Sequence, residues 1–286
     1  MSTQITTAFV EQYSANVYML AQQKASRLAS AVDVEMVKGK NAYFERIGSA
    51  TAQLKTGRHD DTPQIDTPHT RRRVSLEDYV WADLIDNEDQ VRTLIDPTGH
   101  YAKVGAMAMG RTIDDIIISA ALGNAFEGVA GGTTTALTTG QKIAVASAGL
   151  TIAKMVSAKK ILDAAEIDPE APRFMAVSAE QIEDLLNNTT VTSSDYNTVK
   201  ALVAGEIDTF LGFRMIRTER LNTDSNGDRQ VIAWSQPALK LAIGMAPKAR
   251  ISERDDKHYA TQVYFSMSLG ATRMEEEGVV EIACSE

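Results

Sequence analysis

Hydrophobic residues recur at helical spacing in two long stretches of the chain. Over residues 8–31 they predict an amphipathic N-terminal helix, which either packs in the core or lies as an arm on a neighbouring molecule. Over residues 98–126 they predict a helix about 43 Å long, well above the usual length. Small residues such as Gly105 would let this long helix pack closely on a sheet or helix. Further helices are expected over 139–166, over 194–204 and over 237–245. A short helix is also expected directly after Ser178, which would cap it with Gln181 at the capping-box position.

Residues 32–80 follow an extended pattern instead. Alternating stretches such as VDVEMV and NAYFERI are separated by glycines, Pro63 and Pro68 interrupt the middle, and RRRVSLEDYVW resumes the alternation. This predicts two or more long strands joined through a polar, proline-containing tip. Such a ribbon would reach on the order of 70 Å, whereas a compact globule of 286 residues is about 50 Å across. Because an isolated ribbon is marginal in water, it needs a partner to lie on, unless it folds back as shorter strands.

Later strands are expected in the second half of the chain. RFMAV (173–177) reads as a buried strand, and the stretches ARISER, ATQVYFSMSLGATRM and GVVEIACS are strand-like. FLGFRMIRTERL (210–221) and RQVIAWS (229–235) flank the turn NTDSNGD, whose Asn226-Gly227 pair predicts a hairpin. Helices and strands are mixed without regular βαβ alternation, so the expected fold class is α+β.

Composition limits the classes of protein that need considering. Hydrophobic residues make up 44% and charged residues 23%, which is ordinary for a soluble globular protein of one or two domains. Cys284 is the one cysteine, so a reduced compartment such as the cytoplasm is expected. No secretory signal pattern opens the chain, and the most apolar run is too short to span a bilayer, so no membrane association is expected. The net charge of −9 argues against general nucleic-acid affinity.

One polar stretch, RHDDTPQIDTPH, contains metal-capable side chains. The two prolines forbid the helix that a tight histidine metal motif requires, so a solvent-facing loop tip is the favoured interpretation. No catalytic, cofactor or metal residue is predicted. The alternative is a metal-dependent hydrolase that would use His59, Asp60, Asp61 and His69.

Two complementary charge blocks follow that stretch. The arginines are Arg71, Arg72 and Arg73, and the acidic residues between 77 and 89 begin with Glu77 and Asp78. The blocks can join within one chain or between copies, where complementary charge sets register and orientation. Reversing the three arginines to glutamate is expected to impair assembly while leaving the monomer folded. The predicted subunit-interface residues are Arg71, Arg72, Arg73, Glu77 and Asp78, with Phe9, Tyr13 and Val17 from the N-terminal helix.

This layout resembles the major capsid protein of tailed bacteriophages, with the Hong Kong 97-type fold in its podovirus-like branch. Four stretches carry the resemblance, which covers nearly the whole chain: the segment 71–123, Arg-x-x-Asp-Asp at Arg111–Asp115 within it, FLGFRMIRTERL, and GATRMEEEGVVEIAC. The resemblance implies an N-terminal arm (1–31), an extended loop (32–80), a peripheral domain (81–139) with spine helix 98–126, a mostly axial domain (140–245), and C-terminal strands that return to the peripheral domain (246–286).

The resemblance also implies a function and partners. The chain would be a non-enzymatic structural subunit that self-assembles into hexamers and pentamers of an icosahedral capsid around double-stranded DNA. It would sit in the virion after assembly in the host bacterial cytoplasm. Its partners would be copies of itself, a separate scaffolding protein, a portal protein and a possible decoration protein. An encapsulin-type nanocompartment shell, which shares the fold, is a second alternative. The family's isopeptide crosslink is not carried over, because no motif ties Lys55 to a later asparagine.

Overall fold

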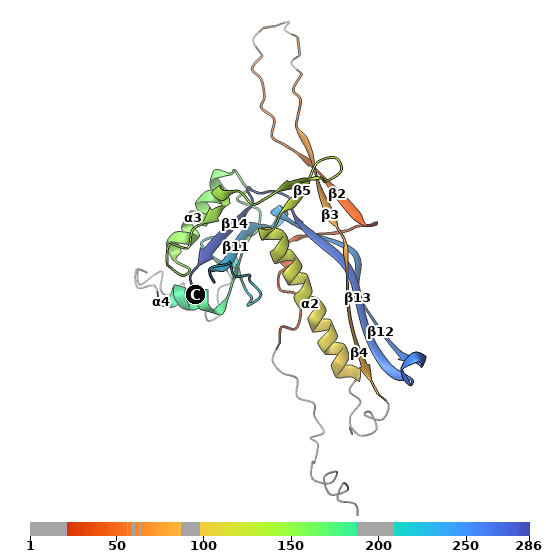
Figure 1. The fold of residues 1–286 in the computed structure, drawn as a ribbon. Coiled ribbons are helices and arrows are strands. Elements are labelled where there is room, and N and C mark those ends of the chain that lie inside the picture. Colours follow the sequence, from red (N-terminus) through yellow and green to blue (C-terminus); the bar gives the residue numbers. More distant parts are fainter. Residues whose placement is uncertain (1–21, 56, 59–60, 63, 87–97, 188–208) are drawn as a thin grey trace, which may run out of the picture. The chain divides into compact units, whose positions relative to one another are not determined.

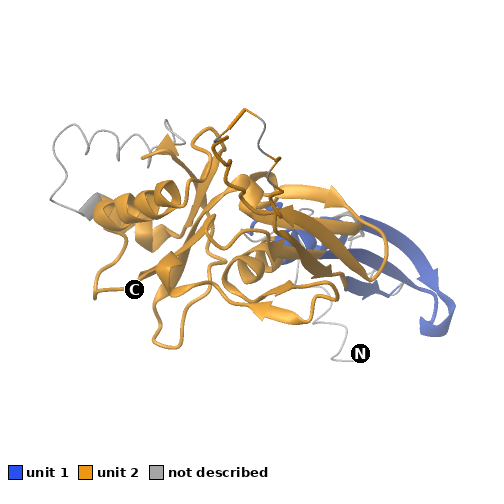
Figure 2. Cartoon of the chain, turned by 90° about the horizontal axis from the view of Figure 1, so that it is seen from above, with its two compact units in different colours: residues 1–26, 78–113, 245–269 blue, residues 27–77, 114–244, 270–286 orange. Residues whose placement is uncertain are grey.

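The computed structural model describes residues 22–55, 57–58, 61–62, 64–86, 98–187 and 209–286. The chain divides into two compact units (Figure 2). Unit 1 comprises Met1–Ser26, Asp78–Ile113 and Met245–Leu269, and unit 2 comprises Arg27–Glu77, Asp114–Gly244 and Gly270–Glu286. The long helix and three strands run through both units. The predicted assignment of arm, loop, peripheral and axial domains stays a prediction.

The long helix α2 spans Thr98–Leu122, close to the predicted 98–126. Its neighbours in unit 1 are parts of the strands β4 (Glu77–Ile85), β12 (Leu239–Arg254) and β13 (Ala260–Arg273), hydrogen-bonded in the order β12-β13-β4. A Cβ at Gly105 would come within 2.7 Å of both the Phe265 and Trp81 rings. The helix approaches the strands this closely only because residue 105 is glycine, as the sequence predicted. Within the described residues, no helix is long and apolar enough to cross a membrane.

Unit 2 is built on a six-stranded sheet in the order β7-β14-β11-β8-β10-β9 among the described residues. The bounds are β7 Lys142–Ile143, β8 Arg173–Val177, β9 Thr209–Phe210, β10 Phe213–Arg217, β11 Arg229–Ser235 and β14 Val279–Cys284. All residues of β8 are buried, as predicted for RFMAV. Phe174 of β8 stacks on Trp234 of β11 at 5.9 Å, and the indole Nε1 donates to the Ala31 carbonyl at 2.9 Å.

The hairpin predicted around Asn226-Gly227 forms only next to the turn, where Thr223 pairs antiparallel with Arg229. The predicted pairing of the two flanking strands is wrong. Asp224 Oδ1 accepts from the backbone N–H groups of Asn226 and Asp228, and Gly227 has φ +90°. The strands on either side are not neighbours, because β8 lies between β10 and β11. β10 runs parallel to β8 and β11 antiparallel to it. A fully buried strand such as β8 needs partners on both edges, and this tertiary demand overrides the local turn signal.

Two predicted helices are partly or wholly wrong. Within 139–166, only α3 (Ile152–Ala164) is α-helical, and its N-cap is Thr151. The short elements η2 (Thr139–Gln141) and β7 precede it. Of 237–245, the first residues form η3 (Gln236–Ala238) and the rest begins β12. Here the start of β12 pairs in parallel with β1 (Asp33–Met36), and pairing decides the conformation of an ambiguous apolar run.

The remaining helix predictions have mixed outcomes. The helix α4 (Ala179–Asn187) forms where predicted, and the Ser178 N–H donates to Gln181 Oε1 at 3.1 Å, as a capping box requires. Residues 22–31 contain only the 3-10 turn η1 (Ala29–Ala31), so the predicted helix does not reach residue 31. Residues 8–21 and 194–204 lie outside the described residues.

A second sheet of unit 2 forms the base of the predicted ribbon. Its order is β2-β3-β5-β6, with β2 Asn41–Ile47, β3 His69–Ser75, β5 Ala125–Glu127 and β6 Thr133–Thr135. β2 and β3 pair antiparallel along their whole length, from Asn41↔Ser75 to Ile47↔His69. Beyond the last pair, Gly48 N donates to Pro68 O at 2.8 Å, and the described parts of 48–68 then run away from the sheet (Figure 1). The prediction of two strands joined by a proline-containing segment is confirmed for Asn41–Ile47 and His69–Ser75, whereas Asp33–Met36 pair with β12 instead.

The Arg-x-x-Asp-Asp stretch ties α2 to its surroundings in unit 2. Asp114 is fully buried and accepts from the backbone N–H groups of Arg27 and Leu28, each at 3.1 Å. Asp115 faces outward and pairs with Arg220, whose Nε lies 2.7 Å from Asp115 Oδ1. The two adjacent carboxylates therefore have different roles. Asp114 accepts backbone hydrogen bonds inside the fold, and Asp115 forms an ion pair at the surface.

We expect Asp114→Ala to lower the free energy of unfolding by about 2–4 kcal/mol, because it leaves backbone N–H groups without acceptors. Asp115→Ala should cost about 1 kcal/mol or less, since its ion pair is exposed. Urea denaturation of the unassembled chain measures both changes. Equal losses in the two variants would show that Asp114 is not the anchor of residues 27 and 28.

Candidate functional site

The β2–β3 ribbon base has two faces of different character. Because side chains alternate along a strand, Phe44, Arg46, Arg72 and Val74 point to one side of the pair. Phe44 and Val74 are buried there against Ala242. We call this the inner face and the opposite side the outer face.

The inner face contains a cluster of charges that we call the arginine cluster: Arg46, Arg72, Arg273, Glu127 and Glu276. Arg46 Nη2 lies 3.0 Å from Glu127 Oε1, and its Nη1 lies 3.6 Å from Glu276 Oε2. Arg72 pairs with both carboxylates, at 3.3 Å from Glu127 Oε2 and in a short contact with Glu276 Oε1. Arg273 Nε lies 3.8 Å from Glu276 Oε1. Three guanidinium groups thus share two carboxylates.

Backbone carbonyls accept further hydrogen bonds from the arginines of the cluster. Arg46 Nη1 donates to Met274 O at 2.6 Å. Arg273 donates to the carbonyls of Ala121 and Gly123 at 2.8 Å and of Thr135 at 3.0 Å. These bonds tie the ribbon, the end of α2 and the turn before β14 into one body within unit 2.

Burial acts strongly on the two inner arginines. Arg72 and Arg273 are fully buried. Burial lowers the pKa of Arg72, and the charges of Glu276 and Glu127 oppose this by raising it. The pKa of Arg273 is lowered by burial in the same way, with Glu276 again opposing. Since arginine keeps its proton even when buried, both guanidinium groups stay charged and depend on these carboxylates.

The outer face presents cations and aromatic rings to solvent. Arg71 forms an exposed ion pair with Glu45 and lies 5.6 Å from the centre of the Tyr43 ring. Arg73 lies 4.8 Å from the centre of the Phe126 ring. Tyr43 and Phe126 are among the exposed large hydrophobic residues of the chain. Arginine and aromatic side chains on one exposed surface are the residue types that dominate binding energy at protein interfaces.

The structure separates the predicted interface residues. Arg71, Arg72 and Arg73 alternate between the faces. Arg71 pairs with Glu45, and Arg72 pairs with Glu127 and Glu276. Arg72 therefore serves the fold. Reversing it to glutamate would place a third carboxylate beside two others, so we now expect the triple reversal to disturb the folded monomer. Glu77 and Asp78 are exposed, whereas Phe9, Tyr13 and Val17 lie outside the described residues.

The candidate metal stretch receives little support. His59 and Asp60 lie outside the described residues, and Asp61 and His69 are exposed. His69 opens β3 opposite Ile47. Among the residues that the structure describes, no group of three histidine, cysteine, aspartate or glutamate side chains is arranged to hold a metal ion.

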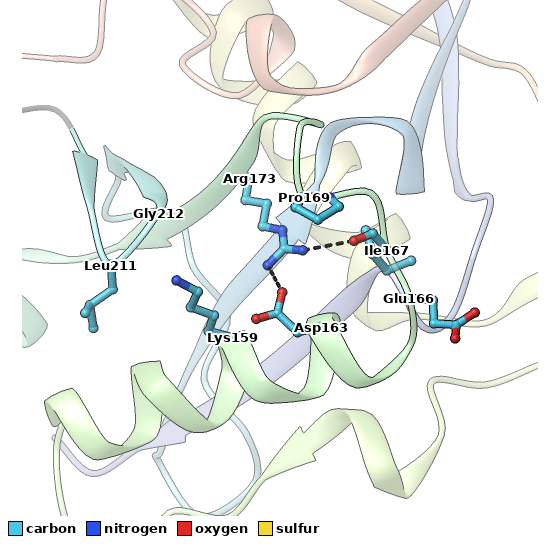
Figure 3. A pocket seen from close by; sticks show the side chains of 8 residues that line it. All are labelled: Lys159, Asp163, Glu166, Ile167, Pro169, Arg173, Leu211 and Gly212. Atoms are coloured by element: carbon cyan, nitrogen blue, oxygen red, sulfur yellow. Dashed lines mark hydrogen bonds and ion pairs between the residues drawn. The ribbon is translucent and has the colours of Figure 1, made fainter.

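A pocket of about 510 Å³ lies in unit 2 between α3 and the turn before β10 (Figure 3). Arg173 reaches into it and pairs with Asp163 at 2.5 Å, and it donates to the Ile167 carbonyl at 3.0 Å. Lys159 extends towards Leu211 at the other side (Figure 3). The hydrogen bonds of Arg173 hold the connection between α3 and β8, so this residue has a structural role.

Sequence reasoning missed most of the arginine cluster. Arg46 carried a usable signal, because the alternation in NAYFERI places it on the same face as Phe44. Glu276 carried none, since it is the middle residue of the run Glu275–Glu277, whose two outer members are exposed.

A sequence profile described as phage capsid protein matches residues 5–286. The chain belongs to the phage capsid protein family. No curated protein sequence matches it at a significant level. The family assignment makes this phage capsid protein a structural subunit of the capsid, and it favours that function over the hydrolase and the encapsulin-type shell.

Solved phage structures share the fold of this phage capsid protein. The capsid structure of cyanophage P-SCSP1u matches with a TM-score of 0.73 and 18% identity, covering 100% of this chain and 96% of that chain. The cyanophage Pam1 capsid asymmetric unit gives 0.70 at 14% identity, covering 98% and 97%. A chain of Mycobacterium phage Che8 gives 0.69 at 18% identity, covering 96% and 97%. The predicted α+β capsid fold is confirmed.

We expect Glu276→Gln to lower the free energy of unfolding by about 3–5 kcal/mol, because it removes one of only two carboxylates that pair with three guanidinium groups, two of them buried. Glu275→Gln and Glu277→Gln make the same chemical change on either side and should leave the urea unfolding curve unchanged. If all three variants unfold at the same urea concentration, the cluster does not stabilise unit 2.

Proposed function

We propose that this capsid subunit forms hexamers and pentamers of an icosahedral shell that encloses double-stranded DNA. The observation that carries the proposal is the family match over residues 5–286. Two structural neighbours support it: one is the asymmetric unit of the bacteriophage PhiM1 mature capsid, and another is the capsid of a native GTA particle computed with C5 symmetry. The net charge of −9 supports a wall that encloses DNA without binding its phosphates tightly.

We also propose the partners and the location that the sequence resemblance implied. A separate scaffolding protein would guide assembly, a portal protein would occupy one vertex, and a decoration protein could bind the outside. Assembly would take place in the bacterial cytoplasm, and the finished subunit would reside in the virion without a catalytic activity of its own.

The outer face of the ribbon base is our proposed contact between copies. Arg71 and Arg73 would meet Glu77 and Asp78 of a neighbouring copy, since both pairs belong to partly or fully exposed stretches of opposite charge. Arg72 leaves the predicted interface set because it is buried in its own chain. The N-terminal residues Phe9, Tyr13 and Val17 stay part of the proposal as a second contact.

Electron microscopy of the purified chain, alone and with a candidate scaffolding protein, tests the proposed function. We expect uniform shells, tubes, or isolated hexamer and pentamer rings. A compact monomer under both conditions at high concentration would contradict a shell-forming subunit.

Charge reversal tests the contact itself. We expect Arg71→Glu with Arg73→Glu, and separately Glu77→Lys with Asp78→Lys, to reduce the yield of assembled particles at least tenfold. Combining the four changes in one chain should restore yield, because each altered surface then meets its complement on the neighbouring copy. Urea unfolding of each variant is the control for the fold. Normal particles from either variant alone would remove these residues from the interface.

A further inference from the structure

Arg46 occupies a particular place on the ribbon. It is the last residue of β2 to point to the inner face, since only the Ile47↔His69 pair lies beyond it. Its guanidinium contacts Glu127 at 3.0 Å, Glu276 at 3.6 Å and the Met274 carbonyl at 2.6 Å. Arg46 therefore joins the end of the β2–β3 pair that lies next to Ile47 and His69 to two separate segments of unit 2. These segments are β5, which contains Glu127, and the turn before β14, which contains Met274 and Glu276.

Charge counting distinguishes Arg46 from the other arginines of the cluster. Removing it leaves Arg72 and Arg273 with Glu127 and Glu276, which is two positive charges against two negative charges. The side chain of Arg46 is also 22% exposed, whereas those of Arg72 and Arg273 are fully buried. The fold of unit 2 can thus keep its buried charges neutralised without Arg46, although it cannot do so without Glu276.

The segment beyond Arg46 amplifies any change of direction at the base. Residues 48–55 are exposed and lead away from β2 (Figure 1). At about 3.3 Å per residue, these eight residues reach at most about 26 Å, so a tilt of about 10° at the base moves their far end by up to about 5 Å. Subunit interfaces pack as densely as protein interiors, so a displacement of this size changes which side chains meet.

We propose that Arg46 is a positioning residue for assembly, which fixes the direction in which segment 48–68 leaves the sheet. This rests on the proposed shell-forming function, because the direction matters only when the segment meets another copy. The planar guanidinium suits the role, since it reaches two carboxylates and a carbonyl at once and resists tilting in more than one direction.

The direction of the segment can be measured in the unassembled chain. Cysteines replace Leu54, which is 89% exposed, and Val156 on α3, which is 50% exposed, and both receive nitroxide labels. Cys284 should stay unlabelled, because it is fully buried and burial raises the pKa of its thiol to about 12. Pulsed electron paramagnetic resonance then gives the distribution of distances between the labels.

In this labelled chain we expect Arg46→Ala to widen the distance distribution at least twofold, with a cooperative urea transition retained. Arg46→Lys should give an intermediate width, because an ammonium group cannot bridge both carboxylates as a planar fork does. The matched control is Arg220→Ala, which breaks another ion pair of unit 2 away from the ribbon and should leave the width unchanged.

Other outcomes would overturn the proposal. Equal widths in Arg46→Ala and the unaltered chain would show that Arg46 does not set the direction, and loss of the cooperative transition would make it a folding residue. In electron micrographs, Arg46→Ala should give particles of mixed size where the unaltered chain gives uniform shells. Uniform particles from both Arg46→Ala and the unaltered chain would contradict the positioning role of Arg46 but not the proposed function. If the unaltered chain formed no particles, the proposed function itself would be contradicted.

Discussion

Two carboxylates pair with three guanidinium groups at the base of the ribbon, and the arrangement of unit 2 depends on this shared ion cluster. Glu127 lies in β5 and Glu276 lies just before β14, so the strands that follow the long helix and those that end the chain both contribute. Buried ion pairs seldom add much net stability, but removing one partner leaves an uncompensated charge in a poorly solvated place. The cluster therefore acts as a geometric constraint, which is satisfied only when three distant segments of sequence come together.

Strands could be predicted from the sequence where a short apolar run indicated burial on both faces, as in RFMAV. They could also be predicted where apolar and polar residues alternated regularly, as in NAYFERI. Prediction failed where the pattern suited more than one structure. LKLAI was predicted to be helical, but its residues Lys240–Ile243 pair with β1. The strand forms because of long-range pairing that no local stretch of sequence contains. The Asn226-Gly227 turn was found correctly, yet the strands beside it take other partners.

The candidate site shows the same division. Alternation along a strand places Arg71, Arg72 and Arg73 on two faces, but the sequence did not say which face is inside. Which face is inside depends on Glu127 and Glu276, which lie 54 and 203 residues after Arg73 in the sequence. A run of three glutamates gives no local sign that its middle member is the buried partner.

The two faces of the ribbon make register the decisive property of this segment. Because side chains alternate with a period of two, a slip of one residue would turn Arg71 and Arg73 inward and Arg72 outward. The cluster opposes such a slip, since only the observed register places Arg72 between its two carboxylates while leaving the Tyr43 and Phe126 rings under the outer arginines. Changes of length within 49–67 do not disturb this register, because the pairing from Asn41↔Ser75 to Ile47↔His69 is complete before the segment begins. The same ion cluster that holds the fold together thus also determines which side chains are available to another copy.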